Sequence, residues 1–202
     1  MTKLDAVNIV LTRNGRAPVS ALDTSAASEA AHAEQLIDEV ELRIQAEGWP
    51  YNTRSDVELE AADDGQIDLP TGCITIDAYG QDAWRHVSQN GGHLYDHDNN
   101  TSTFTGTIRV QYTLRLGWGC IPYPVRDLIA ARAAVTYNER YGRDPQRVAV
   151  LMLEDSRART RAEQHAGRTG NINVLQTPEA ARVRGGDYLS ARRPIWNGGF
   201  NP

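Results

Sequence analysis

The sequence predicts an α+β protein: an antiparallel helical bundle with an inserted antiparallel β-sheet region and an extended C-terminal arm. Apolar residues recur at helical spacing in the first 48 residues and again after residue 121, whereas between these segments they alternate with polar residues. The last 35 residues contain five glycines and keep neither pattern. We therefore expect a helical bundle from residues 1–48 and 121–167, a β-rich insert at 49–120 and an extended arm at 168–202.

Two helices are expected in the first segment. Residues 4–11 carry apolar side chains at helical spacing, and Gly15 stands where glycine commonly ends a helix. Residues 23–25, which read Asp-Thr-Ser, offer N-cap oxygens for a second helix that runs to Gly48. The apolar stripe of this second helix consists of Ala33, Ile37, Val40 and Ile44.

The pattern then changes to the two-residue period of strands. Apolar and polar residues alternate at 57–60, at 74–77 and, most clearly, at 108–116. Turn-forming sequences separate these runs, at 63–65, 90–92 and 96–100. This arrangement predicts an antiparallel meander of short strands with one polar face.

Two further helices are expected after the strands. The third begins after the prolines of "IPYP" and is closed by Gly142, and the fourth has Asp144 as its N-cap, Pro145 in its first turn and an end near Gly167. An Asp155–Arg159 pair is expected along the fourth helix. The stripe of the third helix consists of Val125, Ile129, Ala133, Tyr137 and Tyr141. The core-facing residues of the fourth are Val148, Leu151, Met152, Ala158 and Ala162.

Charge is divided unevenly along the chain. The net charge is −5, yet residues 1–100 carry six Lys and Arg against 18 Asp and Glu, and residues 101–202 carry 15 against eight. Every basic residue except Lys3 is arginine, which makes planar, bidentate contacts with carboxylates and phosphates. This composition favours a protein that holds fixed partners over one that scans nucleic acid, although GC-biased coding would give the same arginine excess.

Composition also bears on compartment. No apolar run approaches the roughly 20 residues that span a bilayer, and the N-terminus lacks the pattern of a signal peptide, so we expect a soluble protein made in the cytoplasm. Cys73 and Cys120 lie far apart without a C-x-x-C spacing. We expect two free thiols and no zinc framework.

Candidate chemical sites find little support in the sequence. "NGRAPVS" at 14–20 has one glycine, no lysine and follows a helix, so it is a helix-to-helix connection rather than a phosphate loop. His93 and His97 would share a face only on a helix, whereas their neighbours favour strand and turn. The acidic pairs Asp63 with Asp64 and Asp96 with Asp98 stand in turn sequences, where Asp commonly bonds to the local backbone. No G-x-S-x-G sequence supports a serine hydrolase.

Several stretches, taken together, resemble one known family. They are "LDAVNIVL" at 4–11, "PVSALD" at 18–23, "GWPYN" at 48–52, "VRDLIAARAAVTYNERYG" at 125–142 and "GNINVL" at 170–175. In this order and spacing they resemble tail tubular protein A, the head-to-tail adaptor of short-tailed, podovirus-type bacteriophages.

The resemblance implies a structural virion protein of the neck or tail, without enzymatic activity, cofactor or metal. It implies a helical bundle with a β-rich part, assembled as a ring of twelve subunits between the portal protein and the tail nozzle, which is tail tubular protein B. Double-stranded genomic DNA would pass through the ring without sequence-specific binding. Two other functions stay open: a tail-associated polysaccharide-degrading enzyme and a DNA-binding module, which would bind less tightly as salt is added.

The resemblance also gives the charge division a possible use. Subunits of a closed ring meet head to tail, so two different faces of one subunit must complement each other. An acidic first half could meet the arginine-rich second half of a neighbour, and an acidic channel would keep DNA from adhering. The candidate acids lie on the second helix and in residues 56–68. In the family the end of the chain reaches neighbouring subunits and the portal. The contact residues expected here are Arg182, Arg184, Tyr188, Arg192, Arg193, Trp196 and Phe200.

Overall fold

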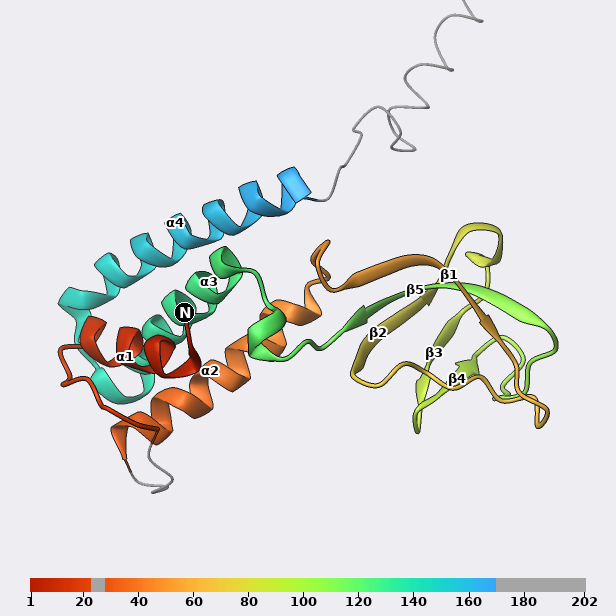
Figure 1. Ribbon diagram of the computed structural model, residues 1–202, viewed down its shortest axis with the longest axis horizontal. Coiled ribbons are helices and arrows are strands. Elements are labelled where there is room, and N and C mark those ends of the chain that lie inside the picture. The colour runs from red at the N-terminus through yellow and green to blue at the C-terminus, as the bar shows by residue number, and fades with distance from the viewer. Residues whose placement is uncertain (23–27, 170–202) are drawn as a thin grey trace, which may run out of the picture. The chain divides into compact units, whose positions relative to one another are not determined.

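The computed structural model describes residues 1–22 and 28–169, and in them helices stand at both ends of the chain with strands between them (Figure 1). This order confirms the α+β fold class. The helices are α1 (Lys3–Arg13), α2 (Glu29–Ala46), α3 (Tyr123–Tyr137) and α4 (Pro145–Thr169). The strands are β1 (Thr53–Glu60), β2 (Cys73–Ala78), β3 (Val87–Asn90), β4 (His93–Asp96) and β5 (Thr107–Leu114). Short 3₁₀ turns occupy η1 (Gly80–Asp82) and η2 (Trp118–Cys120).

Helix α1 has well-defined ends. Thr2 and Asp5 form a capping box, in which each side chain accepts a hydrogen bond from the other residue's backbone N–H. The helix ends at Arg13, and Gly15 follows with a φ of +72°, a conformation that glycine adopts at little cost. The prediction that a glycine-containing connection ends the first helix is confirmed.

Helix α2 begins later than the sequence pattern indicated. Its N-cap is Ser28, whose hydroxyl oxygen accepts a hydrogen bond from the backbone N–H of Ala31 at 3.0 Å. The expected caps at residues 23–25 lie outside the described residues. All four residues of the predicted apolar stripe are buried, so the core-facing side of the helix is as expected.

Helix α3 ends earlier than predicted, and Gly142 does not cap it. The α-helix stops at Tyr137 and continues as one π-helical turn, η3 (Asn138–Gly142). Arg143 then adopts a left-handed conformation with φ +49°, and its N–H donates to the carbonyl of Asn138. Tyr141 consequently leaves the core stripe: it is 41% exposed and stacks on His32 of α2.

Helix α4 starts as predicted, but its side-chain pairing differs. Asp144 accepts a hydrogen bond from the N–H of Gln146, and Pro145 opens the helix. Asp155 does not pair with Arg159; it binds Arg132 of α3, with both carboxylate oxygens within 2.9 Å of Nε. Asp155 lies towards α3, so the tertiary contact replaces the expected pair along the helix. The helix ends at Thr169, two residues beyond the expected Gly167.

The strands form two antiparallel sheets. In the first, β5 is the central strand between β1 and β2, and in the second β3 and β4 make a hairpin. The register shifts between Arg54 and Val57, where Asp56 has a φ of +58° and binds Arg109 of β5. The predicted alternation in 108–116 holds at Ile108 and Val110, which are buried, but not beyond them: Thr113 is buried, Tyr112 and Leu114 are only partly buried, and the strand ends at Leu114.

Two separate hydrophobic clusters support these elements. The larger one joins the four helices and includes Trp49, whereas the smaller one lies under the strands around Leu94 and Ile108. Helix α3 contributes buried residues around most of its circumference and contacts α1, α2 and α4. It is therefore the central helix, and α4 packs mainly on α3.

Candidate assembly surfaces and the joints that hold them

The chain passes from helices to strands through a joint built on one buried amide. Asn52 is fully buried, and its Oδ1 accepts a hydrogen bond from the N–H of Trp49 at 2.9 Å. Its Nδ2 donates to the carbonyls of Gln45 and Leu114, each at 2.9 Å. The indole N–H of Trp49 donates to the carbonyl of Ile44 at 2.8 Å. The "GWPYN" stretch thus fixes the exit of α2 against the end of β5.

A second buried amide closes the same joint. Gln45 is fully buried; its Oε1 accepts from the N–H of Leu116 at 2.8 Å and its Nε2 donates to the carbonyl of Leu116 at 2.9 Å. Nε2 also lies 3.1 Å from the carboxylate of Glu41. Burial raises the pKa of Glu41, while the positive charge of Arg115, whose Nε is 3.7 Å away, acts in the opposite direction.

Two asparagines hold the end of α1 in the same way. Asn8 bonds to both the N–H and the carbonyl of Val19, at 2.8 and 3.0 Å, and so ties the connection after Gly15 back onto the helix. Asn14 is buried and donates to the carbonyls of Val10 and Ala134. Asn138, at the start of the π-helical turn, donates to Asn14 at 3.1 Å. Side-chain amides therefore fix the connection that follows α1 and the π-helical turn that follows α3.

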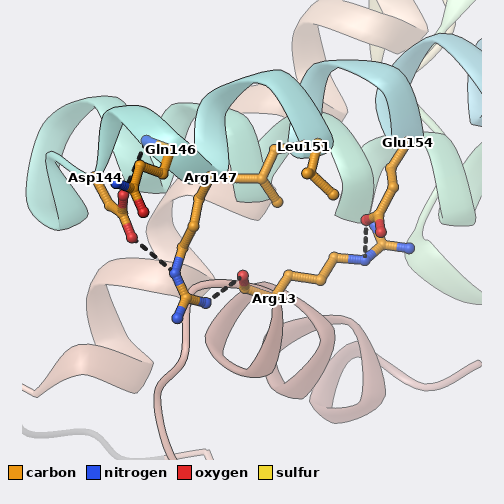
Figure 2. Close-up of a pocket in the computed structure, with 7 residues that line it drawn as sticks. Arg13, Asp144, Gln146, Arg147, Leu151 and Glu154 are labelled. Carbon is orange, nitrogen blue, oxygen red and sulfur yellow. Dashed lines mark hydrogen bonds and ion pairs between the residues drawn. The ribbon is translucent and has the colours of Figure 1, made fainter.

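An open pocket of about 370 Å³ lies between the end of α1 and the first turns of α4 (Figure 2). Arg147 reaches from α4 to the carbonyl of Arg13 at 3.2 Å and also binds Asp144 at 2.9 Å. The Arg13 guanidinium lies 3.0 Å from Glu154. The residues that line the pocket are Arg13, Asp144, Gln146, Arg147, Val150, Leu151 and Glu154.

Beside this pocket, α4 exposes two large apolar side chains three residues apart, Val150 and Leu153, which we call the α4 face. They are 57% and 50% exposed, and Met152, on another side of the helix, is 51% exposed. Met152 was expected in the core, and the structure contradicts this; Val148, also expected there, is only half-buried, and the buried residues of the helix are Leu151, Ala158 and Ala162. An apolar cluster on an outer helix is typical of a protein–protein contact.

A second exposed group lies in the strand-rich part, on what we call the Trp84 loop, residues 79–86. Trp84 is 68% exposed and Tyr79 is 39% exposed. The loop is nevertheless held firmly: Tyr79 N–H donates to the carbonyl of Arg109 at 2.8 Å, and the N–H of Arg109 donates to Asp82 at 2.9 Å. The guanidinium of Arg85 stacks on the Trp84 ring at 5.5 Å.

Ion pairs between the acidic and the arginine-rich halves form within one chain. Arg140 makes two hydrogen bonds to Glu39 of α2, at 2.8 and 2.9 Å. Arg159 of α4 binds Glu47 at 2.6 Å. Acids of α2 that were candidates for a neighbouring subunit are thus already partnered by the chain's own cations.

The candidate chemical residues make local contacts. Asp64 accepts a hydrogen bond from the N–H of Gln66, and Asp96 accepts from the N–H groups of residues 98 and 99, as expected for turn aspartates. These bonds lower the pKa of Asp96; the largest contribution is the side-chain bond from Asn99.

His93 and His97 contact different residues, and the two cysteines do not form a disulfide. His93 lies in β4 and binds Asp68, whereas His97 lies in the following turn and contacts Ser88. Within residues 1–22 and 28–169, His, Cys, Asp and Glu form no group of three or more that could hold a metal ion. Cys73 and Cys120 are free thiols, as predicted.

The predicted contact residues of the arm lie outside the described residues. Sequence reasoning missed the α4 face and the Trp84 loop. Val150 and Leu153 carried a signal, because both are apolar yet fall outside the inner stripe of the helix. None of the helices in the described part of the chain is long and apolar enough to cross a bilayer.

Comparison with known families identifies the chain. The family model named Tail tubular protein matches residues 4–172. The chain belongs to the tail tubular protein family of podophages. Family membership makes it a structural protein of the phage tail and confirms the resemblance found in the sequence. Comparison with curated proteins finds no similar sequence.

The stretches that carry the resemblance to tail tubular proteins have structural roles here. "LDAVNIVL" contains Asn8, which ties the following connection to α1, and "GWPYN" contains Asn52, the centre of the joint between α2 and β5. The helix at 125–142 is the central α3 with its π-helical turn. The stretches named here position elements of the fold, and the stretch at 170–175 lies outside the described residues.

Proposed function

We propose that this tail tubular protein is a head-to-tail adaptor that forms a ring of twelve subunits. The ring would join the portal protein to the tail nozzle and line the channel through which double-stranded DNA is ejected. The family match over residues 4–172 is the observation that carries the proposal. Rigid joints and exposed apolar groups at both the α4 face and the Trp84 loop support it, because a ring subunit must present two different faces in fixed positions.

We propose the following division of labour within the subunit. Residues 1–48 and 121–167 act as the helical domain, residues 49–120 as its insert and residues 168–202 as an arm. In the arm, arginines and aromatic residues are the types enriched at interface centres. The residues proposed to contact the portal or a neighbouring subunit are Arg182, Arg184, Tyr188, Arg192, Arg193, Trp196 and Phe200.

Ring formation tests the proposal directly. The purified chain, alone and mixed with its portal protein, is examined by electron microscopy and by native mass measurement. A particle of twelve copies, or a twelve-copy layer added to the portal, is the expected result. A mixture that contains only free monomers would count against the adaptor function.

The arm has its own test. Removing residues 176–202 is expected to abolish portal binding and to leave the unfolding temperature unchanged, because the core clusters lie within the first 169 residues. If the truncated chain still binds the portal, the arm is not the portal-binding segment, but the proposed ring is unaffected.

The two other functions are separable by assay. A polysaccharide-degrading enzyme would lose glycan release on changing one or two of Asp63, Asp64, Asp96 and Asp98 to Asn. A DNA-binding module would lose affinity steeply as salt is added. We propose neither activity, since Asp64 and Asp96 already bind local backbone groups.

A further inference from the structure

The α4 face is an apolar surface that the described part of the chain leaves uncovered. Helix α4 packs on α3 through Leu151, Ala158 and Ala162. Val150 and Leu153, three residues apart, lie on the same outward side of the helix. Both are at least half exposed, whereas Met152 lies on another side of the helix and is not part of this face. Exposed apolar groups gathered in this way are typical of a surface that a partner covers.

The adjoining pocket suits an aromatic side chain. Val150 and Leu151 supply apolar contacts, and the guanidinium groups of Arg13 and Arg147 stand at its side (Figure 2). Guanidinium groups attract the face of an aromatic ring. The pocket, of about 370 Å³, opens to solvent next to the α4 face.

The same chain presents a matching anchor elsewhere. Trp84 is the most exposed of the large hydrophobic side chains in the described residues. Its loop is fixed at several points, since Asp82 accepts from the N–H of Arg109 and His86 N–H donates to Asp98 at 3.0 Å. A fixed aromatic anchor loses little conformational entropy on binding, which favours a specific contact.

The parts of the chain that carry the two surfaces differ in net charge. Residues 49–120 carry four arginines against ten acids, whereas α4 carries five arginines against three acids. Among the described residues, Arg143 and Arg157, which flank the α4 face in sequence, make no ion pair, and neither does Asp77, two residues before Tyr79. In the pocket, Asp144 and Glu154, which already pair with Arg147 and Arg13, would also face the cationic Arg85 that accompanies Trp84.

We propose that the α4 face and its pocket receive the Trp84 loop of a second copy of this chain. The contact is head to tail, because donor and acceptor are different surfaces, and such contacts build rings when the rotation closes. The inference rests on the proposed ring and names the contact that closes it.

Two variants and two matched controls test the contact in the full-length chain. Self-association is measured by analytical ultracentrifugation over a wide concentration range. Trp84→Ala and Leu153→Asp are each expected to weaken association by about tenfold or more. Tyr123→Ala and Leu42→Asp change side chains that are similarly exposed, 60% and 42%, on α3 and α2, and are expected to stay within about twofold of wild type.

Mixing the two variants gives a sharper result. The Trp84→Ala copy keeps an intact α4 face, and the Leu153→Asp copy keeps an intact Trp84 loop. An equimolar mixture can therefore form one good contact per pair, so dimers appear and larger species do not. Circular dichroism of each variant serves as the control that both remain folded.

Several outcomes would overturn the contact. The contact is wrong if either variant associates as strongly as wild type, if the mixture of variants forms rings, or if the wild-type chain stays monomeric at every concentration. It is also wrong if Leu153→Asp loses only portal or nozzle binding and keeps its self-association. If Trp84→Ala still assembles into rings on the portal, the contact is wrong but the proposed adaptor function is unaffected. Trp84-dependent association without any ring, with or without portal, would instead support the contact and contradict the adaptor ring.

Discussion

Buried side-chain amides carry much of the local geometry of this protein. An amide can donate and accept at once, so it satisfies a free N–H and a free carbonyl at the point where a regular element ends. Asn52 and Gln45 do this between α2 and the end of β5. Asn8 does the same after α1, whereas Asn14 donates to two carbonyls and accepts from the side chain of Asn138.

Replacing Asn52 with Ala tests the joint. The change leaves the N–H of Trp49 and the carbonyls of Gln45 and Leu114 without their partner in a buried site. We expect the free energy of unfolding to fall by about 2–4 kcal/mol in urea denaturation. Asn90→Ala, at an exposed position of β3, is the control and should stay within about 0.5 kcal/mol of wild type. Equal effects of the two variants would show that Asn52 has no special role.

Glu41 gives a pH-dependent prediction. Burial raises its pKa in the folded state, so the ionised carboxylate costs stability above the raised pKa, and this cost disappears below the ordinary pKa of glutamate. Glu41→Gln removes the charge and keeps an oxygen that can accept from Gln45. We expect the variant to be more stable than wild type at about pH 7 and equally stable at about pH 4. A variant less stable than wild type at neutral pH would mean that the Arg115 ion pair outweighs burial.

At the scale of elements, sequence periodicity predicted which faces are buried better than where helices end. The stripe of α2 and the alternation in the first half of β5 follow from side-chain burial, which repeats along an element. The π-helical turn at Asn138 was not predicted from local periodicity; Asn138 bonds to Asn14, 124 residues away, a contact that helical spacing does not reveal. Asp155 was assigned the wrong partner for the same reason: Arg132 lies on another helix.

The candidate surfaces show the same limit. Exposure of Val150 and Leu153 depends on which neighbours α4 has, and a helical wheel gives only the side that faces the core. Trp84 lies in a loop that is held by hydrogen bonds of Tyr79 and Asp82 to Arg109 of β5. The sequence pattern gives no sign of these bonds between residues far apart in the chain. The family resemblance, in contrast, could be recognised from the sequence because its stretches form local joints.

Gly15 tests the connection between α1 and α2. Its φ of +72° is unfavourable for residues with a Cβ, and an added Cβ would meet the guanidinium of Arg147 at 2.8 Å. We expect Gly15→Ala to lower the free energy of unfolding by about 1–2 kcal/mol. Gly117→Ala is the control, because Gly117 has a φ of −63° and open space at its Cβ position. Thermal denaturation of both variants provides the measurement, and equal stability would contradict the assigned strain.

At the scale of the whole molecule, two hydrophobic clusters share one chain. The helical cluster and the strand cluster contain different residues, and the joint at Gln45 and Asn52 links the elements that carry them. Opposite charges also join sequence-distant parts, as in the Arg159–Glu47 pair. Part of the chain's uneven charge is therefore used to hold the subunit together.

The separation of the clusters predicts how a core mutation spreads. Leu94 is fully buried in the strand cluster, so Leu94→Ala should cost about 2–5 kcal/mol. We expect faster amide hydrogen exchange in β1 to β5 and unchanged protection in α3. Leu128→Ala, in the helical cluster, is the reciprocal variant and should expose the helices first. Uniform loss of protection in both variants would show that the clusters unfold as one unit.

The joint also determines how mechanical load would pass through the subunit. The chain leaves the helices near Asn52 and returns near Leu114 and Leu116; the Asn52 amide bonds one crossing to the other, and the Gln45 amide bonds α2 to the returning chain. A pull that separates strands from helices would therefore act on several hydrogen bonds at once instead of breaking them one after another. Tension on the subunit would therefore be shared by both chain crossings rather than carried by one of them.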